Sequence, residues 1–150
     1  MSKKGFTLVE LLAVVALMGV LVIILSTDVV ETFKGTKKQN FVTETREVCR
    51  EATNTFLRES IVTLNAKDYY KINNDTSHAL NLNGRNEFNY FIKVNTDGEV
   101  IAILTWDGTY TIRIVNGNGI EPALITESDI NNNVDTSDMS VEKANQILYN

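Results

Sequence analysis

Residues 3–12 read KKGFTLVELL, and the apolar run that this stretch opens organises the rest of the chain. The twenty residues from Phe6 to Leu25 contain one charged side chain, that of Glu10. As a helix they would be about 30 Å long, which matches the hydrocarbon core of a bilayer. Lys3 and Lys4 precede the run, and this charge bias favours a cytoplasmic N-terminus. The stretch therefore predicts a membrane-spanning helix with two unusual features, a glycine directly before it and an acid inside it.

The acid inside the apolar run has a cost that the other residues outweigh. An ionised side chain at the centre of a bilayer costs about 3 kcal/mol, whereas each Leu, Ile, Val or Phe contributes about 0.3 to 0.6 kcal/mol in favour of insertion. Fourteen of the twenty residues are of these four kinds, so the helix still inserts. An acid in such a place indicates a functional site with a cationic partner. Cleavage after Gly5 would create one, because the new amine of Phe6 would lie about one helical turn from the depth of Glu10 on a neighbouring copy.

The same residues carry a resemblance to a known family. A basic leader, Gly5 directly before Phe6, and Glu10 as the fifth residue after the glycine together resemble the leader junction of type IV prepilins and pseudopilins. The resemblance implies that a membrane-embedded prepilin peptidase cuts between Gly5 and Phe6, and that the new amine of Phe6 is methylated. It also implies that Glu10 neutralises the N-terminus of an adjacent subunit during filament assembly.

Two other interpretations of the N-terminal segment explain less of it. A cleavable secretory signal would have a shorter apolar core that ends in small residues, whereas this core ends in LSTD at residues 25–28. An ordinary single-pass anchor accounts for the length of the run but for neither Gly5 nor Glu10. The prepilin interpretation is therefore favoured.

The composition allows one modest globular domain beyond the helix. Fourteen basic and 19 acidic side chains give a net charge of −5, and loss of residues 1–5 would leave 12 basic side chains and a net charge of −7. An acidic domain argues against nucleic acid as a partner. Cys49 is the only cysteine, so the chain forms no internal disulfide, in contrast to many pilins.

Beyond Leu25 the helical pattern continues, and its polarity changes from apolar to amphipathic. Apolar residues recur at helical spacing among charged ones, which predicts a helix to about Val62 with one buried stripe. The predicted stripe consists of Val30, Phe33, Phe41, Val48, Cys49, Ala52 and Phe56. Gly35 is the expected weak point, because an interior glycine costs about 1 kcal/mol relative to alanine.

The remaining residues predict a small antiparallel sheet and a short last helix. Residues 65–87 predict a loop with at most a short helix, because Asn, Asp and Gly are frequent there. Alternating apolar residues then predict strands at 88–94, 100–106 and 109–115, with only one face of the sheet buried. Asp97-Gly98 and Asp107-Gly108 are hairpin turns, since glycine adopts a positive φ at low cost. Ser140 is the expected cap of a helix near residues 141–148.

The buried stripe of the long helix is the available cover for the apolar face of the strands. The sequence thus predicts an α+β, pilin-like fold, in which a long N-terminal helix spans the membrane with its first half and packs through its second half on the sheet. We divide the chain into a cleaved leader (residues 1–5), a transmembrane and filament-core segment (6–28) and an α+β head (29–150).

Few residues are candidates for chemistry, and the pattern predicts neither an enzyme nor a cofactor. His78 is the only histidine, and it lies in a polar stretch without a matching nucleophile or orienting acid. Cys49 lies on the buried stripe, which favours an inert thiol. Residues 129–133 begin like a calcium loop, but they lack the glycine of the sharp turn and Ser140 stands where a bidentate glutamate is needed. No metal site is therefore expected.

The sequence predicts a structural subunit of a type IV pilus, held in the cytoplasmic membrane as a prepilin and then polymerised into a cell-surface filament through its apolar helix. The expected partners are other copies of the chain, other pilins, prepilin peptidase, the pilus assembly machinery and the membrane. Two alternatives stay open. A pseudopilin of a type II secretion or DNA-uptake system would use the same helix, and a membrane-tethered binding domain would never polymerise. Loss of Glu10 separates the last from the others, because a tethered domain tolerates it.

Overall fold

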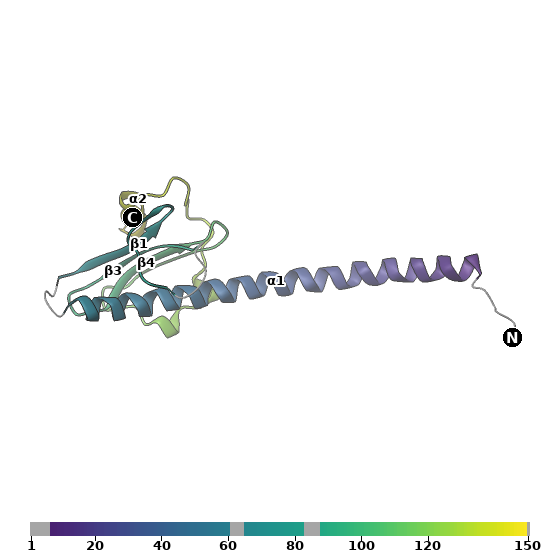
Figure 1. The fold of residues 1–150 in the computed structure, drawn as a ribbon, viewed down its shortest axis with the longest axis horizontal. Helices are drawn as coiled ribbons and strands as arrows, with labels where there is room; N and C mark the ends of the chain where they lie inside the picture. The colour runs from purple at the N-terminus through teal and green to yellow at the C-terminus, as the bar shows by residue number, and fades with distance from the viewer. Residues whose placement is uncertain (1–6, 61–64, 83–87, 150) are drawn as a thin grey trace. The chain divides into compact units, whose positions relative to one another are not determined.

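The computed structural model describes residues 7–60, 65–82 and 88–149, apart from the side chains of residues 25–28. The chain divides into two compact units, Met1–Lys37 and Lys38–Asn150. Helix α1, Leu8–Glu59, begins in the first unit and ends in the second (Figure 1). The second unit also contains a five-stranded sheet and helix α2, Val141–Tyr149. The predicted α+β class is thus confirmed.

Helix α1 is continuous through Gly35, the residue that the sequence marks as a weak point. A Cβ added at Gly35 would meet no side chain within 4 Å, so close packing does not require this glycine. The helix ends at Glu59, and the predicted end near Val62 falls on residues outside the described part of the chain. Arg58 lies in the last turn, where its positive charge complements the negative end of the helix dipole.

The second half of α1 packs on the sheet through one buried stripe. Its members recur at the three- and four-residue intervals of an amphipathic helix. They are Phe41, Val42, Thr45, Val48, Cys49, Ala52 and Phe56. The prediction that Val30 and Phe33 belong to this stripe is wrong, because these side chains are 51% and 64% exposed. Apolar residues recur at helical spacing before Phe41 as well, but the buried face of the helix begins only at Phe41.

The sheet has the strand order β2-β1-β3-β4-β5, and all neighbouring strands are antiparallel. Its strands are β1 (Lys67–Ile72), β2 (Asp75–His78), β3 (Asn89–Val94), β4 (Val100–Trp106) and β5 (Thr111–Val115). The three predicted strands are confirmed as β3, β4 and β5.

Two glycine turns connect β3, β4 and β5, as the sequence predicts. Gly98 and Gly108 have φ angles of 85° and 86°, which only glycine adopts without strain. In each turn an Asn or Asp side chain accepts hydrogen bonds from backbone amides, Asn95 in the first and Asp107 in the second. The register of the three strands is therefore fixed by local turn chemistry.

The expectation of a loop at residues 65–87 is wrong over residues 67–78, which form the β1–β2 hairpin. Ile72 lies opposite Asp75, so the connection is the two-residue turn Asn73-Asn74. Asn73 has a φ of 54°, which asparagine tolerates better than most residues do. The polar composition concealed the hairpin, because β2 is exposed throughout and β1 buries only Tyr69 and Ile72.

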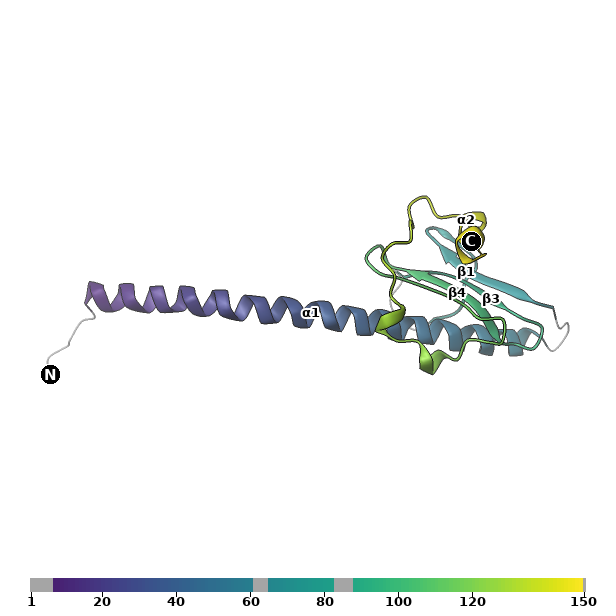
Figure 2. The same ribbon diagram turned by 180° about the vertical axis from the view of Figure 1, so that it is seen from behind.

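Both faces of the sheet are covered, whereas the sequence predicts a half-buried sheet. Figure 2 shows the sheet between α1 and α2. One face packs on α1 through a core that contains Tyr90, Ile92, Ile103 and Ile112. The opposite face packs on α2, and its core contains Phe91, Leu104, Trp106, Ala144 and Leu148. The strands therefore carry apolar residues on both faces, which is why their alternation is incomplete.

A polar segment leads from β5 to α2 over the short 3-10 helices η1 (Pro122–Leu124) and η2 (Glu127–Asp129). The predicted cap of α2 is confirmed, because Ser140 Oγ accepts a hydrogen bond from the Lys143 amide at 3.1 Å. At the other end, the guanidinium of Arg113 donates to the carbonyls of Ile147 and Leu148. Side chains thus satisfy backbone groups at both ends of this nine-residue helix.

Candidate assembly and processing site

The residues that the sequence predicts for processing and assembly are Gly5, Phe6 and Glu10, at or just before the start of α1. Gly5 and Phe6, the predicted cleavage and methylation residues, lie outside the described residues, as do Lys3 and Lys4. The described part of the site begins at Thr7, directly before α1, and includes Glu10 in the first helical turn. The geometry of this site is therefore that of Thr7, Glu10 and the apolar helix that follows.

Thr7 and Glu10 form a reciprocal capping box at the N-terminus of α1. Glu10 Oε2 accepts hydrogen bonds from the Thr7 amide and from the Thr7 hydroxyl, both at 2.9 Å. In return, Thr7 Oγ1 accepts a hydrogen bond from the Glu10 amide at 3.3 Å. These contacts satisfy backbone N–H groups that the start of a helix leaves without an intrahelical partner. In the single chain, Glu10 is thus a helix-capping residue.

The capping box has a signal in the sequence that our prediction for the N-terminal stretch did not include. Residues 7–10 read TLVE, the T-x-x-E spacing of a capping box, directly before an apolar run. The prediction considered Glu10 as an acid inside a membrane helix and as the partner of a neighbour's amine. Its carboxylate also lies at the positive end of the helix dipole, where a negative charge is favourable.

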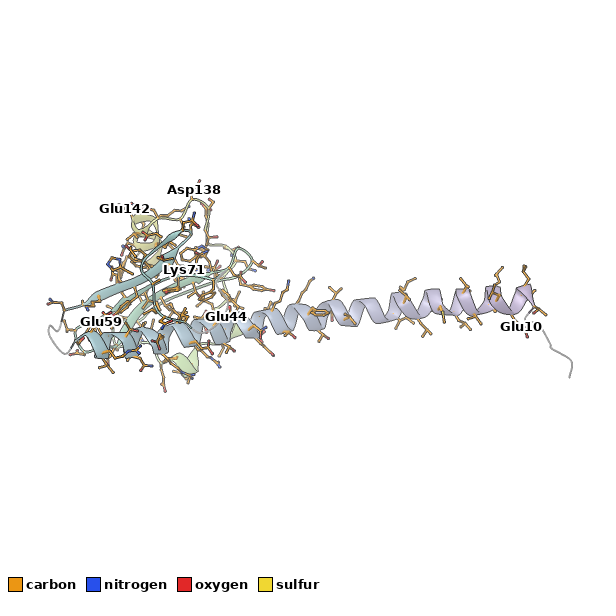
Figure 3. All side chains as sticks on the ribbon, viewed as in Figure 1. Glu10, Glu44, Glu59, Lys71, Asp138 and Glu142 are labelled. Carbon is orange, nitrogen blue, oxygen red and sulfur yellow. The ribbon has the colours of Figure 1, made fainter. Side chains whose placement is uncertain are left out.

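Apolar side chains project from all sides of the helix in the first unit (Figure 3). Every described side chain from Leu8 to Ile24 is exposed. Among the described residues, α1 is the one helix long and apolar enough to cross a membrane. A helix that is apolar all round needs a non-aqueous environment, which lipid or other helices supply.

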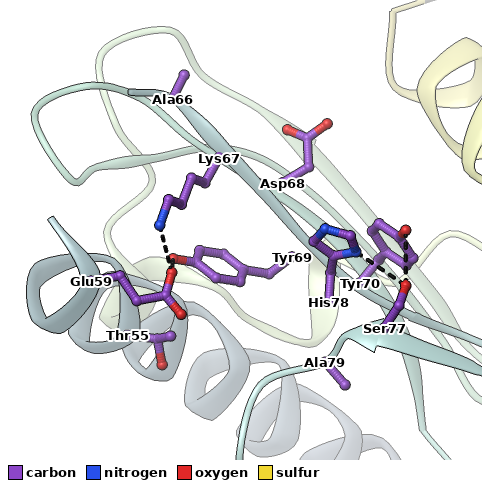
Figure 4. A pocket seen from close by; sticks show the side chains of 10 residues that line it. All are labelled: Thr55, Glu59, Ala66, Lys67, Asp68, Tyr69, Tyr70, Ser77, His78 and Ala79. Carbon is purple, nitrogen blue, oxygen red and sulfur yellow. Dashed lines mark hydrogen bonds and ion pairs between the residues drawn. The ribbon is translucent and has the colours of Figure 1, made fainter. Parts of the chain in front are cut away.

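A second candidate site is a polar cleft of about 620 Å³ in the second unit (Figure 4). Side chains from the last turns of α1 and from β1 and β2 line it. Glu59 Oε2 accepts hydrogen bonds from Lys67 Nζ at 2.8 Å and from the Tyr69 hydroxyl at 3.0 Å. The bond from Lys67 lowers the pKa of Glu59, and burial together with the Glu59 carboxylate raises the pKa of Tyr69. These charges are already paired within the chain.

The serine and histidine of this cleft are arranged for hairpin packing and not for nucleophilic attack. Asp75 Oδ1 accepts hydrogen bonds from the Ser77 amide at 3.0 Å and from the Ser77 hydroxyl at 2.7 Å. Because the serine proton is committed to Asp75, Ser77 Oγ must accept from His78 Nδ1, 3.1 Å away. A general base would need the opposite direction of donation. The His78 ring also stacks on Tyr70, with ring centroids 4.9 Å apart.

The other candidates from the sequence have local structural roles. Cys49 is fully buried, as predicted, and burial raises the pKa of its thiol to about 12. In the calcium-like stretch, Asp129 Oδ2 accepts a hydrogen bond from the Thr126 amide at 2.7 Å, and Asn131 Oδ1 accepts one from the Asn133 amide at 3.0 Å. The described residues contain no group of three His, Cys, Asp or Glu side chains that could hold a metal ion.

Comparison with known proteins identifies the N-terminal segment. Residues 1–26 match the family model of the prokaryotic N-terminal methylation motif, which is the prepilin-type leader of type IV pilins and pseudopilins. The resemblance drawn from the leader junction is thereby confirmed. No curated protein and no solved structure matches the chain. The protein thus combines the leader of a type IV pilin-like or pseudopilin-like prepilin with a long apolar helix and an α+β, pilin-like architecture.

Proposed function

We propose that this protein is a structural subunit of a type IV pilus. It is inserted in the cytoplasmic membrane as a prepilin, cut between Gly5 and Phe6 by prepilin peptidase, methylated on the new amine of Phe6, and polymerised through its apolar helix. The observation that carries the proposal is that the methylation motif, residues 1–26, covers the start of α1, where every described side chain from Leu8 to Ile24 is exposed. A buried helix would offer no surface for polymerisation.

The exposed apolar helix suits two environments in turn. Before assembly its side chains contact lipid, and in the filament they contact the helices of other copies. The hydrophobic effect contributes little to this transfer, because acyl chains and apolar side chains are similar surroundings. Helix packing and the few polar groups of the segment therefore decide whether subunits assemble.

Glu10 is the polar group that sets the register between copies. A carboxylate enclosed by packed apolar helices is costly unless it meets a cation or takes up a proton. The amine of a neighbour's Phe6 is a cation that cleavage would create at the matching depth. Pairing favours one axial register, since other registers leave both charges unpaired. In the single chain the same carboxylate accepts hydrogen bonds from the Thr7 amide and hydroxyl, and the amine of a neighbour would add a charged partner on assembly.

Three variants separate the charge of Glu10 from its capping role. Glu10→Gln removes the charge but keeps the capping box, because glutamine also serves at this position. Glu10→Val removes both, and Thr7→Ala removes the two hydroxyl hydrogen bonds of the capping box while keeping the charge. We expect all three variants to insert and to be cleaved, and only Thr7→Ala to keep filaments. Filament yield in sheared surface fractions, counted by electron microscopy at matched expression, measures the effect.

Each outcome of this comparison has a definite meaning. Wild-type filament yield from Glu10→Val would exclude assembly set by this acid. Absence of filaments from the wild-type chain itself, with insertion and cleavage intact, would favour a membrane-tethered binding domain. Filaments from Glu10→Gln together with none from Thr7→Ala would assign the effect to the cap.

Imaging separates the pilus from a pseudopilin of a type II secretion or DNA-uptake system. An antibody raised against the second unit, Lys38–Asn150, is expected to label filaments on intact cells. A deletion strain that loses protein secretion or DNA uptake, in cells without labelled surface filaments, would favour the pseudopilin.

A further inference from the structure

Three lysines follow the apolar part of α1 and form what we call the basic band, Lys34, Lys37 and Lys38. Their i, i+3, i+4 spacing places them on one face of the helix. All three are exposed, and within the described residues none of them makes an ion pair or a side-chain hydrogen bond. Asp28 and Glu31 precede Lys34, so residues 28–38 carry three basic and two acidic side chains, a balance of 3 − 2 = +1. The band therefore presents a net positive charge to its surroundings.

The rise of the helix fixes the distance of the basic band from the membrane. Lys34 is nine residues beyond Leu25, which corresponds to about 13 Å along a helix. Helical side chains lean toward the N-terminus, here back toward the bilayer, and long lysine side chains extend further in that direction. The headgroup layer is about 5 to 8 Å thick on each side of the bilayer. With the hydrocarbon core ending at Leu25, the ammonium group of Lys34 would reach the headgroups, and those of Lys37 and Lys38 would lie within about one Debye length of them, about 8 Å.

The interval between the membrane run and the band contains exposed apolar side chains as well as the acids Asp28 and Glu31. Val29, Val30 and Phe33 are 49%, 51% and 64% exposed, although they lie beyond Leu25. Such side chains are unfavourable in water and favourable at the boundary between acyl chains and headgroups. An apolar segment followed by an aromatic and then by lysines is the order expected of a helix that leaves a membrane.

We infer that the basic band binds anionic lipid headgroups in the leaflet opposite the leader. The inference rests on the membrane-inserted stage of the proposed function and does not require polymerisation. Lysines on this side oppose the general bias that keeps basic residues in the cytoplasm, so a specific partner accounts for them. The distance from the apolar run to the band is set by one continuous helix, and that distance matches a lipid surface without any second protein.

The test uses the full chain in nanodiscs that contain phosphatidylcholine and a minor fraction of phosphatidylglycerol. Phe33→Trp places a fluorescent reporter beside the band, while the native Trp106 is 3% exposed and supplies a constant background. The minor lipid is either brominated phosphatidylglycerol or brominated phosphatidylcholine, because bromine quenches tryptophan on contact. We expect stronger quenching by the anionic lipid, and loss of the difference in about 1 M salt, where the Debye length falls to about 3 Å.

Matched triple variants isolate the charge. Each lysine near an anionic surface contributes about fivefold to binding, so K34Q/K37Q/K38Q is expected to reduce the enrichment of phosphatidylglycerol at least tenfold. The triple K34R/K37R/K38R keeps the charge and is expected to keep the enrichment. Equal quenching by the two lipids with the lysines intact would overturn the inference, as would enrichment that survives in the glutamine triple.

The lipid measurement also separates this inference from a contact between copies of the chain, and it does not depend on polymerisation. A glutamine triple that keeps its lipid preference but loses filaments would assign the band to a contact between copies. Lipid enrichment is measured without filaments, so a chain that never polymerises still tests the inference.

Discussion

The hydroxyl groups of Thr45 and Thr105 lie 3.0 Å apart in the buried interface between α1 and β4. Both side chains are fully buried. Thr45 Oγ1 donates its proton to the carbonyl of Phe41 at 3.0 Å, so Thr105 must be the donor between the two hydroxyls. This polar link in an apolar core fixes the position of the helix along the strand.

The direction of that hydrogen bond makes the two threonines unequal. Thr45→Val leaves the Thr105 hydroxyl buried without an acceptor, and we expect the free energy of unfolding to fall by about 1 to 3 kcal/mol. Thr105→Val leaves Thr45 bonded to Phe41 and should cost about 1 kcal/mol. Urea unfolding of the full chain in detergent, followed by Trp106 fluorescence, measures both losses. A greater loss for Thr105→Val would contradict the assigned donor, and the double variant should cost less than the sum.

Gly98 and Gly108 form a matched pair for separating backbone strain from steric conflict. Their φ angles are nearly equal, but a Cβ at Gly98 would lie 3.2 Å from Phe56 Cδ1, whereas one at Gly108 would meet nothing within 4 Å beyond its chain neighbours. Gly108→Ala is expected to cost about 1 to 2 kcal/mol, from the backbone alone. Gly98→Ala should cost more, because the ring of Phe56 must shift. An equal decrease in the free energy of unfolding for the two variants would show that the Phe56 ring moves aside at no cost.

Arg113 joins β5 to the C-terminal end of α2. Its guanidinium donates to the carbonyls of Ile147 and Leu148, groups that the end of a helix leaves without partners. We expect Arg113→Gln to lower the free energy of unfolding by about 1 to 2 kcal/mol and to speed amide exchange in α2. Lys143→Gln is the control on the same helix, because it removes a partly exposed pair with Asp135 and a hydrogen bond to the Ser137 carbonyl, neither of which touches the C-terminal end of α2. Unchanged exchange in Arg113→Gln would show that α2 is held by its apolar face alone.

Cys49 predicts a dependence of stability on alkaline pH. Burial raises the pKa of the folded thiol from 9.0 to about 12, so folding favours the protonated form. The contribution to stability is complete below pH 9 and is lost as the pH rises toward about 12. We expect a steeper loss of stability in this range for the wild type than for Cys49→Ala. Slow alkylation by iodoacetamide at pH 9, which becomes fast on unfolding, is the companion measurement, and fast alkylation of the folded chain would contradict a buried thiol.

The proposed cleavage and methylation would change the mass of the mature protein. We expect the protein recovered from cells to begin at Phe6 and to carry one added methyl group. Gly5→Val should block cleavage. The bulky valine side chain would hinder access of the peptidase to the peptide bond, which glycine leaves accessible. Intact mass spectrometry reads both results. A wild-type chain that still begins at Met1, or that is cut near Ser26, would refute the prepilin interpretation.

Local signals in the sequence were sufficient for the parts of the fold that short-range chemistry determines. The glycines at 98 and 108 identified the turns between β3, β4 and β5, and Ser140 identified the start of α2. The leader junction identified the class of the N-terminal segment, which the methylation motif confirms. In each case the residues that carry the signal lie within a few positions of the feature they specify.

Features that depend on tertiary contacts were not predicted. The β1–β2 hairpin is polar, and β1 is stabilised by its pairing with β3, which lies about 20 residues further along the chain. The packing of α2 on the second face of the sheet was also not predicted. The pattern of apolar residues within the strands does not indicate where the last helix packs. The capping box is a different case, because its T-x-x-E signal is local and was overlooked beside the more conspicuous charge.

The two edge strands of the sheet, β2 and β5, influence whether the sheets of neighbouring subunits can pair. β2 has only four residues, all of them exposed, and it begins with the acid Asp75. At the other edge, the Asn131 amide donates to the Thr111 carbonyl at 2.7 Å, so β5 is partly occupied from within the chain. Open, long, apolar edges recruit strands from neighbours and lead to irreversible aggregation. In a filament, where copies stand side by side, a short polar edge and an occupied edge would keep neighbouring sheets from fusing, so that subunits could be withdrawn from the polymer still folded.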